Sequence, residues 1–144
     1  MIRGAMTALA ALLVFGAVSP ATLAGASGAD QTIRVQDGQI RCLVSADFEG
    51  RGRPAVLCVR TDGAPFGTSP APLNVAVVLG SGEMYFQKGG LPAAEGGDVA
   101  LGAGQTYTVN GWTITTEPLR TLIRNDDGGH GIRINPVEVA AIWT

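Results

Sequence analysis

The sequence predicts a small all-β domain, an antiparallel β-sandwich or barrel with one disulfide-tied hairpin. Apolar and β-branched runs of strand length recur after residue 29, and turns rich in glycine separate them. No stretch in this part of the chain repeats apolar residues with the helical period. The pair Asn110-Gly111 stands between two alternating runs, which is the strongest short-range signal for a tight hairpin.

Residues 1–29 predict a cleavable secretory signal peptide, and residues 30–144 predict a single β domain. Arg3 supplies a positive charge at the start, residues 5–18 are uncharged and largely apolar, and Ser19-Pro20 ends this run. A membrane anchor would need about 20 apolar residues. Small residues follow, so we expect cleavage between Ala26 and Ala29 and a secreted or cell-wall-associated product.

Cys42 and Cys58 are the two cysteines of the chain, and an even number in an exported protein predicts a disulfide rather than free thiols. They lie in β-rich runs at residues 40–45 and 55–60, joined by a loop of glycines and charges. If the cysteines face each other, the hairpin centres on Gly50 within this loop. The turn signal and the bridge therefore predict the same register.

The remaining elements follow in chain order. Residues 61–72 contain three prolines and predict a surface connection. We expect a buried strand at 73–79, its partner at 83–87 and a glycine-rich loop at 88–97. Further strands are predicted at residues 105–109, 112–116, 119–125, 132–135 and 137–143.

Charge excludes two classes of partner. The chain carries ten Lys and Arg against twelve Asp and Glu, for a formal net charge of −2. The basic residues are scattered arginines and one lysine, Lys88, and they form no run. Nucleic-acid binding needs a basic face, and a polybasic membrane site needs clustered Lys or Arg. We expect no nucleic acid partner and no membrane insertion after signal cleavage.

Three short motifs carry a family resemblance. They are the cysteine pair in Arg41-Cys42 and Leu57-Cys58, the step Gly104-Gln105-Thr106-Tyr107 with Gly111-Trp112-Thr113-Ile114, and the turn 125–131. Together they resemble small exported proteins of mycobacteria and related actinobacteria, whose C-terminal turn reads T-N-D-x-T-G-H-G. Arg124 and Gly128 stand here where that turn has threonines. The resemblance implies export and a disulfide, and it brings no activity or catalytic residue with it.

His130 is the one histidine of the chain, so any acid–base or metal chemistry would involve it. Asp126, Asp127 and His130 form a candidate ligand turn with two carboxylates and an imidazole. The alternative is a plain hairpin turn, in which Asp and Gly supply the backbone angles. A catalytic zinc site needs three well-placed ligands and a calcium loop needs more oxygens, so we prefer the plain turn and expect no metal or cofactor.

A Ser–His–Asp hydrolase is the second enzymatic alternative, with Ser45, Ser69 or Ser81 as the nucleophile. None of the three lies in a G-x-S-x-G elbow. The glutamates form no pair typical of a glycosidase, and cysteines in a bridge supply no thiol. We expect no assembled catalytic residues.

Two further features are candidate binding surfaces. An aromatic strip that binds glycan or peptide is one interpretation of Tyr85, Phe86, Tyr107, Trp112 and Trp143, but core packing is the more common use of such residues. Arg51 and Arg53 at the first hairpin tip could contact an anionic partner, or simply be solvated.

The sequence thus favours a non-enzymatic secreted domain, which we expect to be a monomer and to bind a cell-wall component, a protein or a host surface. The alternatives are a weak metal-assisted or Ser/His hydrolase centred on His130, and an enzyme inhibitor that presents the Cys42–Cys58 hairpin as a rigid loop.

Overall fold

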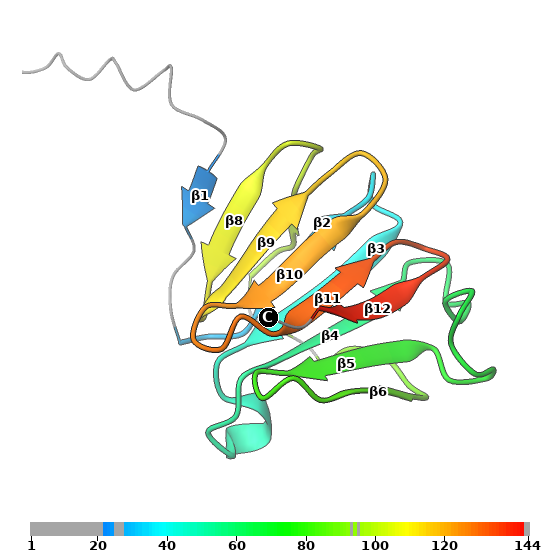
Figure 1. Cartoon of the computed structure of the whole chain (residues 1–144), viewed down its shortest axis with the longest axis horizontal. Coiled ribbons are helices and arrows are strands. Elements are labelled where there is room, and N and C mark those ends of the chain that lie inside the picture. Colours follow the sequence, from blue (N-terminus) through cyan, green and yellow to red (C-terminus); the bar gives the residue numbers. More distant parts are fainter. Residues whose placement is uncertain (1–21, 25–27, 93, 95, 143–144) are drawn as a thin grey trace, which may run out of the picture.

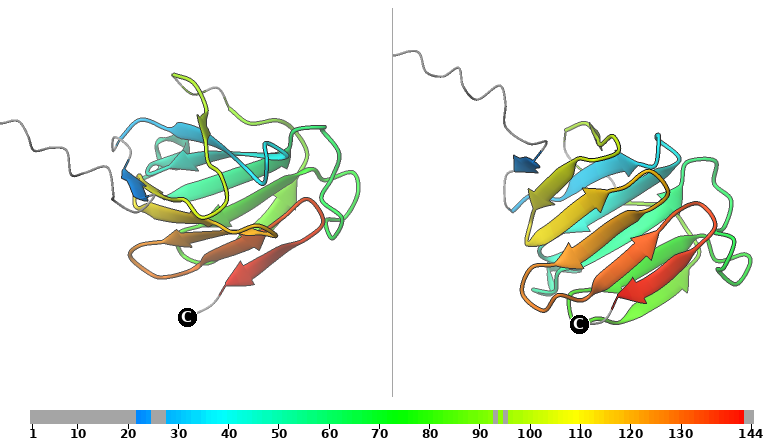
Figure 2. Two further views of the ribbon diagram at one scale, coloured as in Figure 1. Left: turned by 90° about the horizontal axis from the view of Figure 1, so that it is seen from above. Right: turned by 45° about the horizontal axis from the view of Figure 1, so that its top comes forward.

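Two six-stranded sheets face each other as a β-sandwich (Figure 1). The computed structural model describes residues 22–24, 28–92, 94 and 96–142. Sheet A has the strand order β1-β8-β9-β10-β11-β12, and sheet B has the order β6-β5-β4-β3-β2-β7. The two layers are separated most clearly in the view from above (Figure 2). The predicted all-β class is confirmed.

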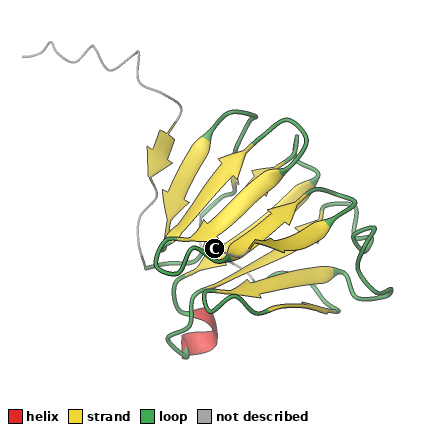
Figure 3. Cartoon of the chain, in the orientation of Figure 1, coloured by secondary structure: helices red, strands yellow, loops and turns green. Residues whose placement is uncertain are grey.

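The strands have the following bounds. Sheet B contains β2 (Gln31–Val35), β3 (Ile40–Ser45), β4 (Ala55–Arg60), β5 (Val75–Leu79), β6 (Met84–Gln87) and β7 (Val99–Ala100). Sheet A contains β1 (Thr22–Ala24), β8 (Thr106–Val109), β9 (Trp112–Thr116), β10 (Thr121–Asn125), β11 (Gly131–Ile134) and β12 (Val139–Ile142). In the described residues, helix is confined to the 3-10 turn η2 (Phe48–Gly50) between β3 and β4 (Figure 3). No helix of this part of the chain is long and apolar enough to cross a membrane.

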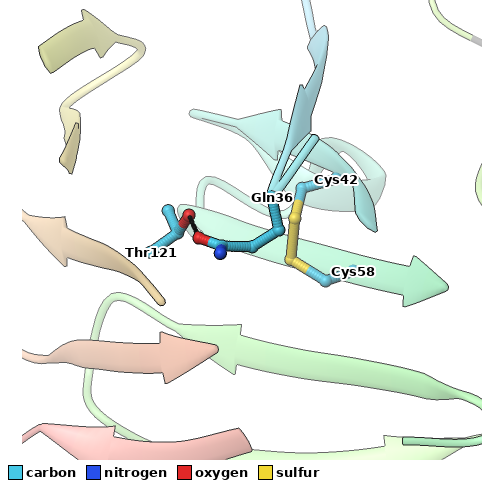
Figure 4. Close-up of a disulfide and its surroundings, with 4 residues drawn as sticks. All are labelled: Gln36, Cys42, Cys58 and Thr121. Carbon is cyan, nitrogen blue, oxygen red and sulfur yellow. Dashed lines mark hydrogen bonds between the residues drawn. A yellow bond between two sulfur atoms is a disulfide. The ribbon is translucent and has the colours of Figure 1, made fainter. Parts of the chain in front are cut away.

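The disulfide-tied hairpin is confirmed with its register. Cys42 on β3 lies directly opposite Cys58 on β4 and is bonded to it. The pairs run outward from Ser45 opposite Ala55 to Ile40 opposite Arg60, so Gly50 lies at the midpoint. Both cysteines are fully buried and belong to the core between the sheets. Figure 4 shows the bridge beside this inter-sheet space.

Buried polar contacts join the two sheets at two places. The Oγ1 of Thr121 on β10 donates to Oε1 of Gln36, which follows β2, at 2.6 Å (Figure 4). Elsewhere, Nε1 of Trp112 on β9 donates to the carbonyl of Ser45 at 3.3 Å, and Nδ2 of Asn110 donates to the carbonyl of Val44 at 3.0 Å. Because buried polar groups cost free energy when unpaired, these contacts fix how the sheets face each other.

The central strands β4 and β5 of sheet B have apolar contacts on both faces. The inner face of the sheet joins the main core, while its outer face carries a second apolar cluster of Ala55, Leu57, Val75, Val77 and Leu79. Phe48 from η2 and Leu91 from the loop after β6 pack against this outer cluster. A strand covered on both faces needs no polar alternation. This explains why β5 is apolar along its whole length, as the sequence predicted for a buried strand.

The two sheets share a topology that the sequence did not reveal as a repeat. Strands β2–β6 and β8–β12 are each a five-stranded antiparallel meander. β1 precedes β2 in the chain but pairs in parallel with β8, and β7 precedes β8 but pairs in parallel with β2. The strand that precedes each meander in the chain, its leading strand, therefore joins the sheet of the other meander. The two meanders in this sense exchange their leading strands.

Candidate anion-binding groove

Two arginines face each other on the outer side of sheet B. Arg34 on β2 is the register partner of Arg41 on β3. Their side chains are 43% and 32% exposed, whereas neighbouring Ile33 and Cys42 point into the core. Like charges directly opposite each other on a sheet destabilise it. This pair therefore requires a compensating group.

Asp98 is that group. It lies at the end of the glycine-rich loop, and its Oδ2 accepts from Nε of Arg34 at 2.7 Å and from Nε of Arg41 at 2.9 Å. The hydroxyl of Thr32 donates to the other oxygen at 2.5 Å. The hydrogen bonds from Arg41 and Thr32, in that order, lower the pKa of Asp98 well below its ordinary value, against a desolvation that raises it. Asp98 is therefore a permanent carboxylate at neutral pH.

A groove of about 310 Å³ opens beside these arginines. Its walls come from the ends of three strands and two connections, and it is lined by Arg34, Arg41, Val59, Arg60, Thr61, Gly63, Asn74, Gly89 and Gly90. Asn74 fixes one wall, because its side chain donates to the Gly89 carbonyl at 2.8 Å and accepts from the Gly89 amide at 3.0 Å. The groove is therefore open to solvent but bounded by ordered backbone.

The described residues at the groove carry more positive than negative charge. Arg60 pairs with Asp62 at 2.6 Å, and Arg34 and Arg41 share Asp98, so three guanidinium groups face two carboxylates. Arg34 and Arg41 bind Asp98 only through Nε. No described residue accepts a hydrogen bond from their terminal Nη atoms, which hold four of the five N–H groups of a guanidinium. The site can therefore offer paired donors to one more anionic group.

The predicted ligand turn lies elsewhere, between β10 and β11. Asp126 accepts from the Thr113 hydroxyl at 2.6 Å, and Oδ1 of Asn125 accepts from the amides of Asp127 and Gly128. His130 is half-buried against Gly128. In the described residues, no three His, Cys, Asp or Glu side chains are grouped as they would be to hold a metal. A role for Asp126, Asp127 and His130 in binding a ligand stays a prediction.

The candidate serines differ in their surroundings. Ser45 is fully buried on β3, and the Ser69 hydroxyl lies within hydrogen-bond distance of the Phe66 and Leu73 carbonyls, to either of which it can donate its one proton. Ser81 is exposed in the β5–β6 turn, which lies beside the His130 turn: a Cβ on Gly128 would be 3.6 Å from the Gly80 carbonyl oxygen. A hydrolase centred on His130 therefore has Ser81 as its most accessible serine.

Core packing is confirmed for most of the aromatic residues considered as a strip. Trp112 and Tyr107 are buried in the main core, and Phe86 packs against it. Tyr85 on β6 is 40% exposed, and Trp143 lies outside the described residues. Arg51 and Arg53 are exposed at the tip of the first hairpin. None of the described side chains in this set lines the arginine groove.

Local sequence patterns do not indicate this groove, because the residues that line it are far apart along the chain. A signal was available for Arg41, since alternation along a strand that buries Cys42 places Arg41 on the opposite face. Arg34 likewise alternates with Ile33 and Val35. Nothing local links either arginine to Asp98, which only the fold brings to them.

Comparisons with known proteins identify no relative: no family description, curated protein or solved structure matches this chain. The resemblance to exported actinobacterial proteins thus stays a prediction.

Proposed function

We propose that the protein is a non-enzymatic extracellular binding module whose arginine groove holds a carboxylate of a cell-wall, protein or host-surface partner. The observation that supports this most strongly is the pair of opposed guanidinium groups beside an open groove, whose Nη atoms donate to none of the residues that the structure describes. Arginine binds carboxylates through paired parallel hydrogen bonds, and these are stronger than bonds between neutral groups.

Charge balance favours a carboxylate over a phosphate or a densely sulfated chain. Among the described residues, three guanidinium groups and two carboxylates leave one net positive charge, which matches a single carboxylate. The carboxylate of Asp98 is an example of such a group, because it already accepts hydrogen bonds from both arginines. The remaining lining, with Thr61, Asn74 and glycine backbone, can hydrogen-bond the neutral part of the partner.

Binding to immobilised polygalacturonate and polyglutamate, with neutral dextran as the blank, tests the proposal. Retention on polygalacturonate identifies a uronate glycan as the partner, and retention on polyglutamate identifies an acidic polypeptide. We expect at least tenfold weaker retention at high salt, because partly exposed charge pairs are screened. Equal retention on dextran, or none on either polyanion, contradicts the proposal.

Gly90 allows a clean variant, because a Cβ there would meet no atom within 4 Å. Gly90→Glu adds a carboxylate to the groove and should weaken binding at least tenfold at an unchanged melting temperature. Gly90→Gln has nearly the same shape without the charge and should bind like the wild type.

Arg41→Gln removes one of the groove's guanidinium groups and should weaken binding. Arg133 is exposed on β11 of the other sheet, so Arg133→Gln makes the same change in net charge outside the groove and serves as the control.

The hydrolase alternative has a direct discriminating result. Turnover of an ester or glycan substrate that His130→Ala abolishes would replace the binding proposal by an enzymatic one. Inhibition of secreted proteases that Arg51→Ala and Arg53→Ala abolish would favour the inhibitor alternative, because both side chains lie on the disulfide-tied hairpin.

A further inference from the structure

Part of the segment that the sequence assigns to the signal peptide is built into the fold. Strand β1 pairs in parallel with β8, with Thr22 opposite Thr106, Leu23 opposite Tyr107 and Ala24 opposite Thr108. All three β1 residues lie before the cleavage positions expected between Ala26 and Ala29.

Asn110 adds a second, independent contact to the same segment. Its Oδ1 accepts from the Gly28 amide at 2.8 Å, and its Nδ2 donates to the Ala29 carbonyl at 2.8 Å. Nδ2 also donates to Val44 on the other sheet, so this buried side chain joins residues 28–29 to both layers. Cleavage after Ala29 would remove both of these partners of Asn110 and leave its buried polar atoms short of hydrogen bonds.

The topology gives β1 a defined place. β7 completes sheet B beside β2, and β1 completes sheet A beside β8 in the same parallel manner. Without β1, β8 would become the edge of sheet A, and its backbone groups on that side would lose their partners. With β1 in place the edge strand is only three residues long, and short edge strands are a common way to protect the edge of a sheet. The fold therefore uses residues 22–24 in the same way that it uses Val99 and Ala100.

We propose that the mature protein begins at Thr22 and that signal peptidase hydrolyses the bond between Ala21 and Thr22. One water molecule is consumed, which leaves a carboxylate on Ala21 and an amino group on Thr22. In sequence, Ser19 and Ala21 provide the small residues that such a site requires three and one positions before the cut, directly after the apolar run. This inference rests on export, which belongs to the proposed function.

The test is expression of the full chain in a secreting host, followed by intact mass and N-terminal sequencing of the exported protein. We expect Thr22 as the first residue. A first residue between Ser27 and Asp30 overturns the inference while leaving export intact. An uncleaved chain retained in the cytoplasm overturns the inference as well as the extracellular location on which the proposed function depends.

Bulky substitutions identify the cut independently of any later trimming. Ala21→Phe should cause the precursor to accumulate, whereas Ala26→Phe and Ala29→Phe should be processed like the wild type, because only the cut after Ala21 requires a small residue there. The opposite pattern contradicts the proposal.

Hydrogen exchange on the exported protein supplies a structural readout. The β8 amides that point away from β9 should be protected by β1, and Leu23→Pro should raise their exchange at least tenfold, because proline constrains the strand and removes a backbone donor. Rapid exchange at these amides in the wild type would show that β1 is absent from the mature domain.

Discussion

Arg34 lies directly opposite Arg41 across strands β2 and β3, and a single oxygen of Asp98 accepts from the Nε of both. Two like charges are thereby held side by side on the outer face of sheet B. The same ion cluster fastens the end of the long glycine-rich loop to the sheet. Because Asp98 takes up only the Nε donors, structural and ligand-binding roles can coexist in one cluster.

Replacing Asp98 should give a stability loss that depends on pH. Its pKa is lowered in the folded state, so it stabilises the fold fully above the unfolded value of about 4, and this contribution is lost as the pH falls from there towards the folded value. We expect Asp98→Asn to cost about 2 kcal/mol at pH 7. In urea unfolding, the difference in free energy of unfolding between the wild type and Asp98→Asn should become smaller below about pH 4. Asp127→Asn, at an exposed position, serves as the control. A stability difference between the wild type and Asp98→Asn that does not change with pH contradicts the stabilising role of the Asp98 carboxylate.

Removing the disulfide should destabilise the domain markedly. The bridge closes a loop with a sequence separation of 16, which corresponds to about 3 kcal/mol on the chain-entropy argument. Cys42→Ala with Cys58→Ala should therefore unfold at a clearly lower urea concentration, since both side chains also lie in the core. Adding a reductant should bring the wild type towards the variant and leave the variant unchanged. Equal midpoints for the oxidised wild type and the variant would refute the prediction.

Gly131 should tolerate no side chain. A Cβ there would overlap the carbonyl oxygen of Ile123 and approach Cα of Arg124 to 2.9 Å, at the first pair of the β10–β11 ladder. Gly131→Ala should cost more than about 3 kcal/mol or abolish soluble expression, since the backbone of a paired strand has to move. Gly102→Ala is the matched control, because its Cβ would only reach ordinary contact with Gln105. Comparable stability of the two variants would argue against this packing.

Gln36 and Thr121 should show an energetic coupling across the sandwich. Their 2.6 Å hydrogen bond is buried, so Thr121→Val or Gln36→Leu alone leaves one polar group without this partner. Each single variant should lose about 1 to 2 kcal/mol. The double variant should lose less than the sum, by about 1 kcal/mol, in a double-mutant cycle from urea unfolding. Strict additivity would mean that this bond does not contribute to joining the sheets.

Local patterns were sufficient for much of the fold. The β3–β4 hairpin has the bounds and the register that its alternation, its turn and its cysteines predicted. The Asn110-Gly111 turn joins β8 and β9 as expected, with both residues at positive φ. Strand β2 was missed because its alternating stretch directly follows the signal-like segment. The two residues of β7 are too few to give a periodic signal.

The arrangement of the sheets and the groove could not be predicted in this way. Contacts between residues far apart in sequence, such as Trp112 with Ser45, determine how the two meanders face each other. Contacts of the same kind determine which short strand completes the edge of each sheet. The same holds for the groove. Its arginines are separated along the chain, so the sequence does not reveal that they are neighbours on the sheet. The predicted turn at Asp126, Asp127 and His130 was located by its local sequence, but its role needs binding data.

The exchange of leading strands has a consequence for folding. β1 lies before the first meander in the chain but completes the sheet of the second, and β7 lies before the second meander but completes the sheet of the first. Neither half of the chain therefore contains a complete sheet. Pairing of β1 with β8 and of β2 with β7 joins residues far apart in sequence, so both sheets have to assemble together. A chain broken between β6 and β7 would give two interdependent fragments, and the intact protein should melt as one cooperative unit.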